Sequence, residues 1–453
     1  MESLVDFHQY HQRLDDVETI RVSGFVRSVI GTIIEAGGPR SAIGTLCRVF
    51  PRGENGREGT PMLAEVVGFD EDGVKLMPLH EMRNVVPGSR VERVRSKPVV
   101  RVGEDMLGRV LDPLGEPLDD LPAPHGQHER FLYGQPGNPM HRRRIEKSLD
   151  VGVRSVNAML TLALGQKVGI FAGSGVGKSV LLGMFARNTS ADINVIALIG
   201  ERGREVREFI ERDLGPEGLR RSIIISATSD RSPLQRVRAA YLATTIAEHF
   251  RDQGKKVLLM MDSLTRFAMA RREIGLAIGE PPTSKGYTPS VFALLPSLLE
   301  RAGNAQGEGG ITGIYTVLVE GDDMNDPVAD TARSILDGHI VLSRKLAAQN
   351  HFPAVAVLES ASRCMSDVVS REHKEMAAQV RQILADYAEA EDLINIGAYA
   401  KGSNPRIDRA IELIEPLRAF LRQDVEETVD FPKTIRALAQ ILRDAPPANG
   451  GRR

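Results

Sequence analysis

KVGIFAGSGVGKSVLLGMFA (residues 167–186) joins an apolar run to a glycine-rich turn, a Lys-Ser pair and an amphipathic segment. A strand that enters such a turn and leaves it as a helix lets backbone N–H groups surround a polyphosphate. Glycines allow the turn to curl without Cβ clashes, and the helix N-terminus adds a positive dipole. We therefore predict a nucleotide-binding P-loop in this stretch.

The residue types of this turn each have a use in binding a polyphosphate. Lys178 would neutralise the β- and γ-phosphate oxygens, as a binding and a catalytic group, and Ser179 would ligate Mg²⁺. The strict motif has glycine five residues before Gly177, where this chain has Ala172, but a small side chain suffices there. A chance glycine-rich turn is the alternative interpretation. We predict ATP and Mg²⁺ as ligands. The predicted nucleotide-binding residues of the turn are Gly173, Ser174, Gly175, Val176, Gly177, Lys178, Ser179 and Val180.

A P-loop needs an acidic partner for the metal ion, and KVLLMMDSLTRFAMA (256–270) supplies one. Five apolar residues, 257–261, lead into Asp262. An unbroken apolar run fits a central parallel strand buried on both faces, with its carboxyl end at the edge where ligands bind. A lone acid after a strand is, in isolation, more often a helix cap. Beside a P-loop, we interpret Asp262 as a Mg²⁺ ligand, together with Ser179.

NVIALIGERGREVREF (194–209) places Glu201 directly after another apolar strand. P-loop hydrolases orient the attacking water with a carboxylate or Gln, and Glu201 is our predicted catalytic residue for that task. Arg202 is also predicted to be catalytic, and two roles stay open for it: contact with a phosphate, or an ion pair with Glu201. We expect Glu205 and Glu208 on a solvated helix face.

Composition and charge limit the functions that the chain can have. Of 453 residues, 42% are hydrophobic and 26% charged, and 58 Lys and Arg against 60 Asp and Glu leave a net charge of −2. A general nucleic-acid binder would carry a clear basic excess, so we expect no nucleic-acid partner. Cys47 and Cys364 allow neither a disulfide framework nor a zinc site. Because MESLVDFHQYHQRLDD carries no secretory signal and no apolar run reaches about 20 residues, we expect a cytoplasmic protein.

The chain divides into four predicted parts. Residues 1–18 carry apolar positions at helical spacing and are either a frayed terminus or a segment that docks a partner or a membrane surface. Residues 19–97 alternate short β-type runs with turns, which predicts a small β-barrel. Residues 98–366 begin with a Gly- and Pro-rich connector (101–124) and then alternate strands with helices, the pattern of an α/β parallel sheet. The charged, helical pattern of residues 367–453 predicts an α-helical domain.

Taken together, these motifs resemble the catalytic subunits of the rotary ATPase superfamily, through AGSGVGKS, GERGREV and LLMMDSLTRFAMA. Within it, DSLTRFAMARREIGLAIGEPPTSKGYTPSVFALLPSLLERAG (262–303) closely resembles the flagellar export ATPases, relatives of the type III secretion ATPases. VLVEGDDMNDPVAD (317–330) and LDGHIVLSRKLAAQNHFPAV (336–355) resemble them as well. The likeness covers residues 20–440. It implies a RecA-like P-loop core with a small N-terminal β-barrel and a C-terminal α-helical domain.

The resemblance implies roles for individual residues. Glu201 stands where the family has its catalytic carboxylate. Arg363, in LESASRCM, matches an arginine that reaches into a neighbouring subunit's site to stabilise transition-state charge. By itself Arg363 would be a surface ion-pair arginine. Phe352, in HFPAV, matches the aromatic residue that stacks on adenine, although its own pattern would place it in the core. Segment 270–288 resembles a loop that faces a central channel.

A site completed by a neighbour's arginine predicts a closed ring, and the family implies a homohexamer. The family also implies partners: a regulator of the export apparatus, a coiled-coil stalk protein, complexes of export chaperones with their substrates, and a membrane export gate. It places the ring in the cytoplasm at the inner face of the cytoplasmic membrane. ATP hydrolysis would there energise chaperone release and the unfolding and export of flagellar subunits.

Four other functions remain as alternatives. The sequence of residues 262–330 favours a flagellar ATPase over the secretion ATPase of a virulence injectisome. A catalytic subunit of a rotary ATP synthase would have an acidic loop at the corner 395–405, and this chain lacks one. A hexameric RNA or DNA motor is disfavoured by the balanced charge. A ring subunit that binds nucleotide without hydrolysing it would lack Glu201.

Overall fold

The computed structural model describes residues 22–52, 57–94, 98–319, 321, 323 and 326–444. The predicted docking segment 1–18 lies outside the described residues. The chain forms two compact units. One contains the residues up to Pro98 together with Ile274–Glu280, and the other contains Val99–Glu273 and Pro281–Arg453.

The first unit contains a closed six-stranded barrel with the strand order β1-β2-β5-β4-β3-β6. Alternation along its strands builds the interior, because Val26 is 2% exposed whereas its neighbour Phe25 is 57% exposed. The predicted N-terminal β-barrel is therefore confirmed. The barrel strands are β1 (Ser23–Ile30), β2 (Ile33–Ala36), β3 (Leu46–Phe50), β4 (Met62–Asp70), β5 (Gly73–Pro78) and β6 (Arg90–Arg93).

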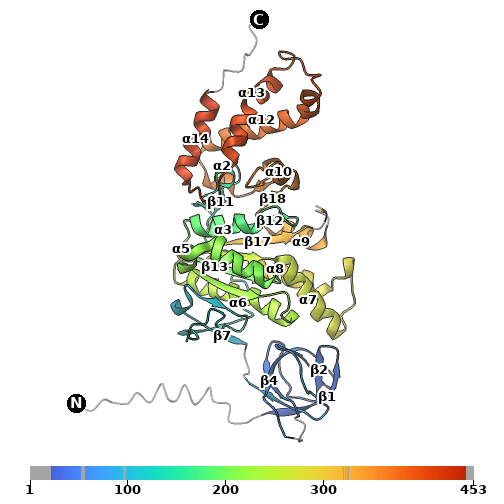
Figure 1. Cartoon of the computed structure of the whole chain (residues 1–453). Helices are drawn as coiled ribbons and strands as arrows, with labels where there is room; N and C mark the ends of the chain where they lie inside the picture. The colour runs from blue at the N-terminus through green and yellow to red at the C-terminus, as the bar shows by residue number, and fades with distance from the viewer. Residues whose placement is uncertain are drawn as a thin grey trace, which may run out of the picture. The chain divides into compact units, whose positions relative to one another are not determined.

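A mainly parallel sheet forms the centre of the second unit (Figure 1), with the strand order β19-β18-β12-β17-β15-β13-β14-β8. Its middle strands are buried on both faces, which is why they are continuous apolar runs in the sequence. The predicted parallel-sheet core is confirmed. The sheet strands are β8 (Val110–Leu111), β12 (Lys167–Ala172), β13 (Ile193–Ile199), β14 (Ser222–Ala227), β15 (Lys256–Asp262), β17 (Gly310–Leu318), β18 (Gly338–Leu342) and β19 (Ala361–Ser362), with β16 (Gly303–Asn304) paired to β17.

Helices cover the sheet. The long helix α6 (Pro233–Asp252) packs on β13, β14 and β15, and α9 (Pro327–Ile335) packs on β12 and β17. Helix α3, which follows the P-loop, shares an apolar core with sheet side chains such as Ile196 and Met260. The other helices of this part are α3 (Lys178–Asn188), α4 (Gly203–Glu208), α5 (Gly215–Arg220), α7 (Leu264–Ile278), α8 (Pro289–Leu299) and α10 (Arg344–Ala348), and a π-helical turn spans Phe209–Leu214.

The C-terminal helices extend this apolar core, because Val380 and Leu417, both 0% exposed, belong to the same cluster as the sheet residues. Helices α12 and α13 pair with each other, and the predicted corner 395–405 lies between them. The predicted C-terminal α-helical domain is confirmed. Its helices are α11 (Met365–Val368), α12 (Arg371–Asn395), α13 (Pro405–Leu421) and α14 (Phe431–Asp444).

The connector at residues 101–124 differs from its prediction, because it contributes a strand to the central sheet. Val110–Leu111 pairs in parallel with β14. The Arg109 guanidinium holds the strand in place through two hydrogen bonds to the Asp119 carboxylate, at 2.8 and 2.9 Å. A strand of two residues has no periodicity to detect in the sequence. The remaining short elements are α2 (Arg154–Met159), β7 (Val99–Val102), β9 (His128–Phe131), β10 (Ser148–Leu149), β11 (Leu162–Ala163) and single 3-10 turns at Glu104–Met106, Pro139–His141, Ser284–Gly286 and Val357–Glu359.

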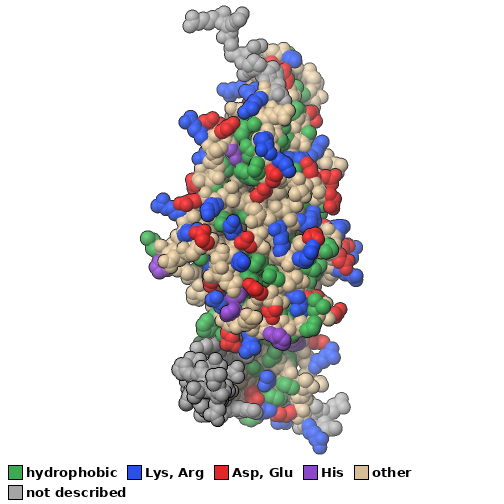
Figure 2. Space-filling view, turned by 90° about the vertical axis from the view of Figure 1, so that its left-hand side faces the viewer, with side chains coloured by type: hydrophobic (Ala, Val, Ile, Leu, Met, Phe, Trp, Pro, Cys, Tyr) green, Lys and Arg blue, Asp and Glu red, His purple; other side chains and the backbone are tan. Residues whose placement is uncertain are grey.

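The surface carries both signs of charge. On the face drawn in Figure 2, Lys and Arg side chains alternate with Asp and Glu rather than gathering by sign, in keeping with the balanced composition. Within the ranges that the structure describes, no helix combines the length and the apolar character needed to cross a membrane.

Candidate active site

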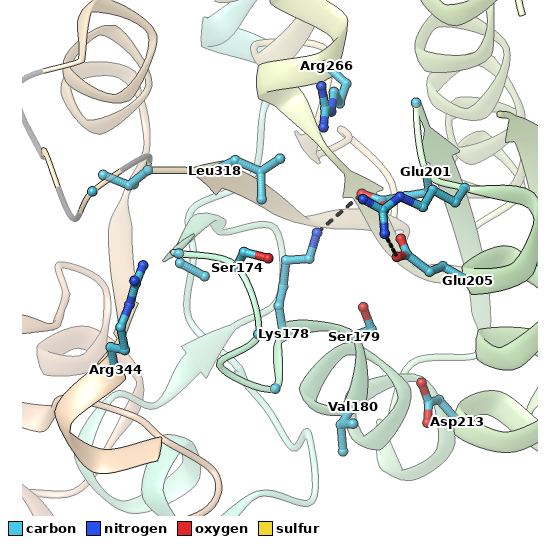
Figure 3. A pocket seen from close by; sticks show the side chains of 18 of the residues that line it. Ser174, Lys178, Ser179, Val180, Glu201, Glu205, Asp213, Arg266, Leu318 and Arg344 are labelled. Atoms are coloured by element: carbon cyan, nitrogen blue, oxygen red, sulfur yellow. Dashed lines mark hydrogen bonds and ion pairs between the residues drawn. The ribbon is translucent and has the colours of Figure 1, made fainter. Parts of the chain in front are cut away.

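A cavity of about 570 Å³ opens where the parallel strands of the central sheet end (Figure 3). Because these strands run in parallel, the loops that follow β12, β13 and β17 meet at one edge of the sheet. The volume lies in the range of small-molecule sites. The lining residues are Ala172, Gly173, Ser174, Gly175, Gly177, Lys178, Ser179, Val180, Gly200, Glu201, Arg202, Glu205, Arg212, Asp213, Arg266, Leu318, Val319, Gly321 and Arg344.

The P-loop forms one wall of this cavity. Gly175 and Gly177 have φ values of 79° and 88°, a conformation that other residues rarely adopt. Helix α3 begins at Lys178, and no side chain caps its N-terminus. Its first N–H groups are therefore available to an anion. Of the predicted binding residues, Val176 does not line the cavity, since its side chain is 2% exposed and packs in the core.

Lys178 lies between two carboxylates. Its Nζ atom is 2.5 Å from Asp262 Oδ1 and 3.4 Å from Glu201 Oε1, and Figure 3 shows the contact with Glu201. Asp262 is 3% exposed and also accepts a hydrogen bond from the Thr316 hydroxyl at 2.7 Å. Burial alone lowers the pKa of Lys178, but the charges of Asp262 and Glu201 outweigh it, so the net pKa is raised. The ammonium group is thus held charged where phosphate oxygens would bind.

Glu201 follows β13 and Gly200. Burial and then the negative charge of Asp262 raise the pKa of Glu201 to about 7, although Lys178 opposes the shift. A carboxylate with a pKa near the working pH suits the acceptance of a proton from an attacking water. The structure therefore places the predicted catalytic carboxylate beside the P-loop lysine, with a protonation equilibrium that suits this role.

The predicted metal ligands fit Mg²⁺. Ser179 lines the cavity, and Asp262 stands directly behind Lys178 at the end of β15. No group of three or more His, Cys, Asp or Glu residues among the described ones could hold a metal by itself. Mg²⁺ usually takes one or two protein oxygens, with substrate phosphates and water filling the other positions. Ser179 and Asp262 offer oxygens of the kind that Mg²⁺ takes, and their role as ligands stays a prediction.

Of the two roles left open for Arg202, phosphate contact stays a prediction, since Arg202 lines the cavity, whereas the ion pair with Glu201 and the expectation for Glu205 need correction. Arg202 does not pair with Glu201. Its Nη1 atom lies 3.3 Å from Glu205 Oε1, and its side chain is 80% exposed. Glu205 is not on a purely solvated face, because it lines the cavity and its hydrogen bond to Glu201 helps to raise the pKa of Glu201. Glu208 does face solvent, where it pairs with Arg204 at 3.6 Å. Helical spacing in the sequence could not show that Glu205 lines the cavity whereas Glu208 faces solvent.

The sequence interpretation missed two arginines that line the cavity, Arg266 and Arg344. Arg266 lies in the first turn of α7, four residues after Asp262, so its position after a buried strand was an available signal. The only polar contact of its guanidinium within the described part is with Met269 Sδ, at 3.8 Å. An arginine without a carboxylate partner at this edge is suited to bind an anion.

Phe352 stands beside the P-loop. Its ring is 39% exposed, and a Cβ atom added at Gly177 would lie 3.5 Å from it. The backbone N–H of Gln423 donates a hydrogen bond to the Phe352 carbonyl at 2.9 Å. The Gln423 side chain in turn accepts from Arg154 N and donates to Gly152 O, both at 2.8 Å. The segment between α13 and α14 therefore holds the backbone of Phe352 in place. No sequence motif predicts this contact.

Arg363 lies at the opposite edge of the sheet. Its N–H donates to the Asp337 carbonyl at 2.9 Å, and the Asp337 carboxylate accepts from Lys167 N, at the start of β12. The P-loop follows the far end of that strand, roughly 17 Å away at 3.3 Å per residue. Arg363 is exposed, and none of the ion pairs between described residues includes it. Its backbone therefore lies at the edge of the sheet opposite to its own chain's cavity.

Three regions of the chain match known protein families. Residues 26–95 match the beta-barrel domain of the ATP synthase alpha/beta family, and residues 152–362 match its nucleotide-binding domain. Residues 369–440 match the T3SS EscN ATPase C-terminal domain. The three matches follow the order of the barrel, the sheet and the helical domain.

Whole-chain similarities agree with these matches. The chain is 54% identical to the flagellum-specific ATP synthase of Bacillus subtilis, over 92% of this chain and 94% of that protein. It is 49% identical to the type 3 secretion system ATPase of Xanthomonas euvesicatoria, over 93% of this chain and 94% of that protein. A solved structure of the assembled ATPase EscN with its central stalk EscO, from the type III secretion system of enteropathogenic E. coli, superposes with a TM-score of 0.84 at 45% identity. That match covers 92% of this chain and 100% of EscN.

Proposed function

The chain belongs to the family of flagellum-specific and type III secretion ATPases, and on that premise we propose that it is the Mg-ATP-hydrolysing, homohexameric ATPase of a flagellar protein-export apparatus. As a member of this family the chain is an ATP-hydrolysing enzyme. The observation that carries the proposal is the grouping of Lys178, Glu201 and Asp262 at the P-loop, with Arg363 at the other edge of the same sheet.

Hydrolysis would use these groups as follows. The N–H groups at the start of α3 and the Lys178 ammonium bind the phosphates, while Phe352 stacks on the base. Glu201 orients a water molecule whose oxygen attacks the γ-phosphorus, and the carboxylate accepts the water proton. The bond from the γ-phosphorus to the bridging oxygen breaks, and ADP leaves with that oxygen. Ser179 and Asp262 would hold Mg²⁺, which when bound would neutralise charge on the phosphates.

A ring follows from the position of Arg363. Since its backbone lies a full strand length from its own P-loop, it would reach a nucleotide in a neighbouring copy. A head-to-tail interface of this kind closes into a ring when the rotation between subunits closes. The similarity to EscN in its assembled form supports a closed ring, and we propose six copies.

Complementation between two inactive variants tests the composite site. Glu201→Gln and Arg363→Ala should each lose at least about 100-fold of the Mg-ATP turnover. In rings assembled at random from equal amounts, about a quarter of the interfaces join an intact Glu201 to an intact Arg363. Turnover should therefore reappear on mixing. Mixing Glu201→Gln with the double variant is the matched control and should restore nothing. Mixed rings, verified by mass, that stay inactive would contradict a shared site.

The export role extends to partners. We propose a central coiled-coil stalk protein, as in the EscN complex with EscO, and in addition an export-apparatus regulator, chaperone–substrate complexes and the membrane export gate. The ring would act in the cytoplasm at the inner face of the cytoplasmic membrane. Affinity purification from native cells, followed by mass spectrometry, tests this. Recovery of export-gate proteins and chaperones supports the flagellar role, whereas recovery of the rotor subunits of an ATP synthase would overturn it.

A further inference from the structure

A second cavity, of about 210 Å³, adjoins the nucleotide cavity. Arg266 and Leu318 line both cavities, so the two spaces share a wall. In Figure 3 these two residues stand on the same side of the nucleotide cavity, away from Ser179. Arg266 therefore stands between the two cavities.

Two guanidinium groups face this second cavity without a carboxylate partner. Among the described residues, the Arg266 guanidinium has its one polar contact with Met269 Sδ, as described above. Arg272, one helical turn and a half further along α7, lies with its guanidinium carbon 5.2 Å from the centre of the Tyr287 ring. None of the ion pairs within the described residues includes either arginine. Their positive charges therefore remain uncompensated.

The two acids at the cavity share one cation. Lys285 Nζ lies 3.0 Å from Asp323 Oδ2 and 3.5 Å from Asp326 Oδ2. Among the described residues, three cations against two carboxylates leave the charged lining with a positive balance of one. If Lys285 were withdrawn, two arginines would face two carboxylates, and the positive balance would be lost. The charge of the cavity thus depends on a single lysine, which is carried by the loop between α7 and α8.

We propose that this cavity is a second oxyanion site, which receives the inorganic phosphate released in the nucleotide cavity and holds it before it reaches solvent. The inference rests on the proposed ATP hydrolysis, which supplies the phosphate. Arginine is well suited to the ion, because its planar fork donates two parallel hydrogen bonds to phosphate oxygens. Phosphate moves from Arg266 to Arg272, and Lys285 shields it from Asp323 and Asp326.

Binding of free phosphate tests the site directly. The protein is saturated with Mg²⁺ and a non-hydrolysable ATP analogue, which fills the nucleotide cavity, and radiolabelled inorganic phosphate is measured by equilibrium dialysis. We expect one phosphate per chain, bound about tenfold more weakly by Arg272→Gln. Arg271→Gln is the matched control, because Arg271 neighbours Arg272 but does not line the cavity. Its affinity should stay within about twofold of the parent. Absent binding, or equal losses in both variants, would overturn the site.

The charge argument has its own test. Lys285→Gln should weaken phosphate binding at least as much as Arg272→Gln, because Asp323 and Asp326 then repel the ion. The triple variant Lys285→Gln, Asp323→Asn, Asp326→Asn lacks the ion pairs too, but it also lacks the repulsion. It should regain affinity to within about threefold of the parent. If the triple variant binds as weakly as Lys285→Gln, loop displacement rather than charge explains the loss, and the assignment is wrong.

Single-turnover kinetics separates product phosphate from phosphate taken up from solution. Cleavage is followed by chemical quench, and release by a fluorescent phosphate sensor. Arg272→Gln should change the release rate several-fold and leave the cleavage rate within about twofold. Unchanged release would overturn the product route. A parent protein that hydrolyses no ATP would instead overturn the proposed function, so the two failures are distinguishable.

Discussion

The phosphate end of the nucleotide cavity and the proposed base end, at Phe352 beside the P-loop, are built in different ways. At the phosphate end, Lys178, Glu201 and Asp262 follow three strands of one sheet, so their proximity is set by strand pairing. At the base end, Phe352 lies beside the P-loop, and the hydrogen bond from Gln423, in the segment between α13 and α14, holds its backbone. The first end belongs to one layer of secondary structure, and the second joins the sheet to the helical domain.

This difference predicts a division of labour. Groups fixed by the sheet meet the reacting phosphates and should control turnover. Groups held by the helical domain meet the base and should control nucleotide affinity. A displacement of α12 and α13 would be transmitted to the base end, because the chain runs directly from α13 into the segment that holds Phe352.

The largest effect is expected at the phosphate end. Glu201→Gln should lower kcat at least about 100-fold while nucleotide binding persists, because only proton acceptance is lost. It should not lower the Tm at pH 8. The folded-state pKa of Glu201 is raised from 4.5 to about 7, so the parent loses stability as pH rises through that interval, and the neutral glutamine escapes the loss. Turnover at the parent rate would refute the assignment.

Lys178→Ala provides the contrast at the same end. It should abolish turnover and also destabilise the chain by about 3–5 kcal/mol, because Asp262 remains buried without its cation. Thermal unfolding of both variants at pH 8 checks this. A lysine variant as stable as the parent would mean that the contacts of Lys178 with the two carboxylates carry no stability.

The next effect is expected at the base end. Phe352→Ala should weaken ATP binding ten- to a hundredfold, because base–aromatic stacking contributes about 1–3 kcal/mol. The kcat at saturating ATP should stay within about threefold of the parent. Inorganic tripolyphosphate, which has no base, is the control ligand, and its affinity should be unaffected. Equal losses for ATP and tripolyphosphate would show that Phe352 shapes the P-loop rather than binding the base.

The two ends should respond to pH with opposite signs. His351, next to Phe352, is 5% exposed, and burial followed by the charges of Arg422 and Arg418 lowers its pKa to about 4. The stability that neutral His351 contributes is fully present above its unfolded-state pKa of 6.5. It is lost as the pH falls toward 4, and the loss reaches about 2 kcal/mol by pH 5. The Tm difference between the parent and His351→Gln should therefore shrink from pH 7.5 to pH 5. A constant difference would exclude this titration.

The smallest effect is expected at Gln423, which contacts Phe352 rather than the base. Gln423→Ala should raise KM for ATP three- to tenfold with kcat within about twofold, because the segment that holds Phe352 loses buried hydrogen bonds. Arg381→Ala is the matched control. Arg381 ties α12 to the core through the carbonyls of Val357 and Met159, away from Phe352. A KM that rises equally in both variants would show that the whole helical domain, rather than Gln423, positions the base end.

Much of the architecture was predictable because its signals are local. The barrel, the parallel sheet and the helical domain each have their own periodicity, and the comparisons and the fold confirm all three. The P-loop and the acids at the ends of β13 and β15 could be placed together because parallel strands end at one edge. Phe352 and Arg363 came from family resemblance, and their catalytic roles stay predictions. In the sequence neither carries a signal beyond an ordinary core or surface residue.

The sequence by itself determined which strands would end at the phosphate site, because a continuous apolar run indicates a strand that is buried on both faces. Only the tertiary structure decided which side chains beyond those strand ends face the cavity. It turned Arg202 toward Glu205, brought Arg266 between two cavities and placed Gln423 behind Phe352. The physical reason is that strand pairing fixes backbone neighbours, whereas contacts between loops and helices depend on how whole layers pack.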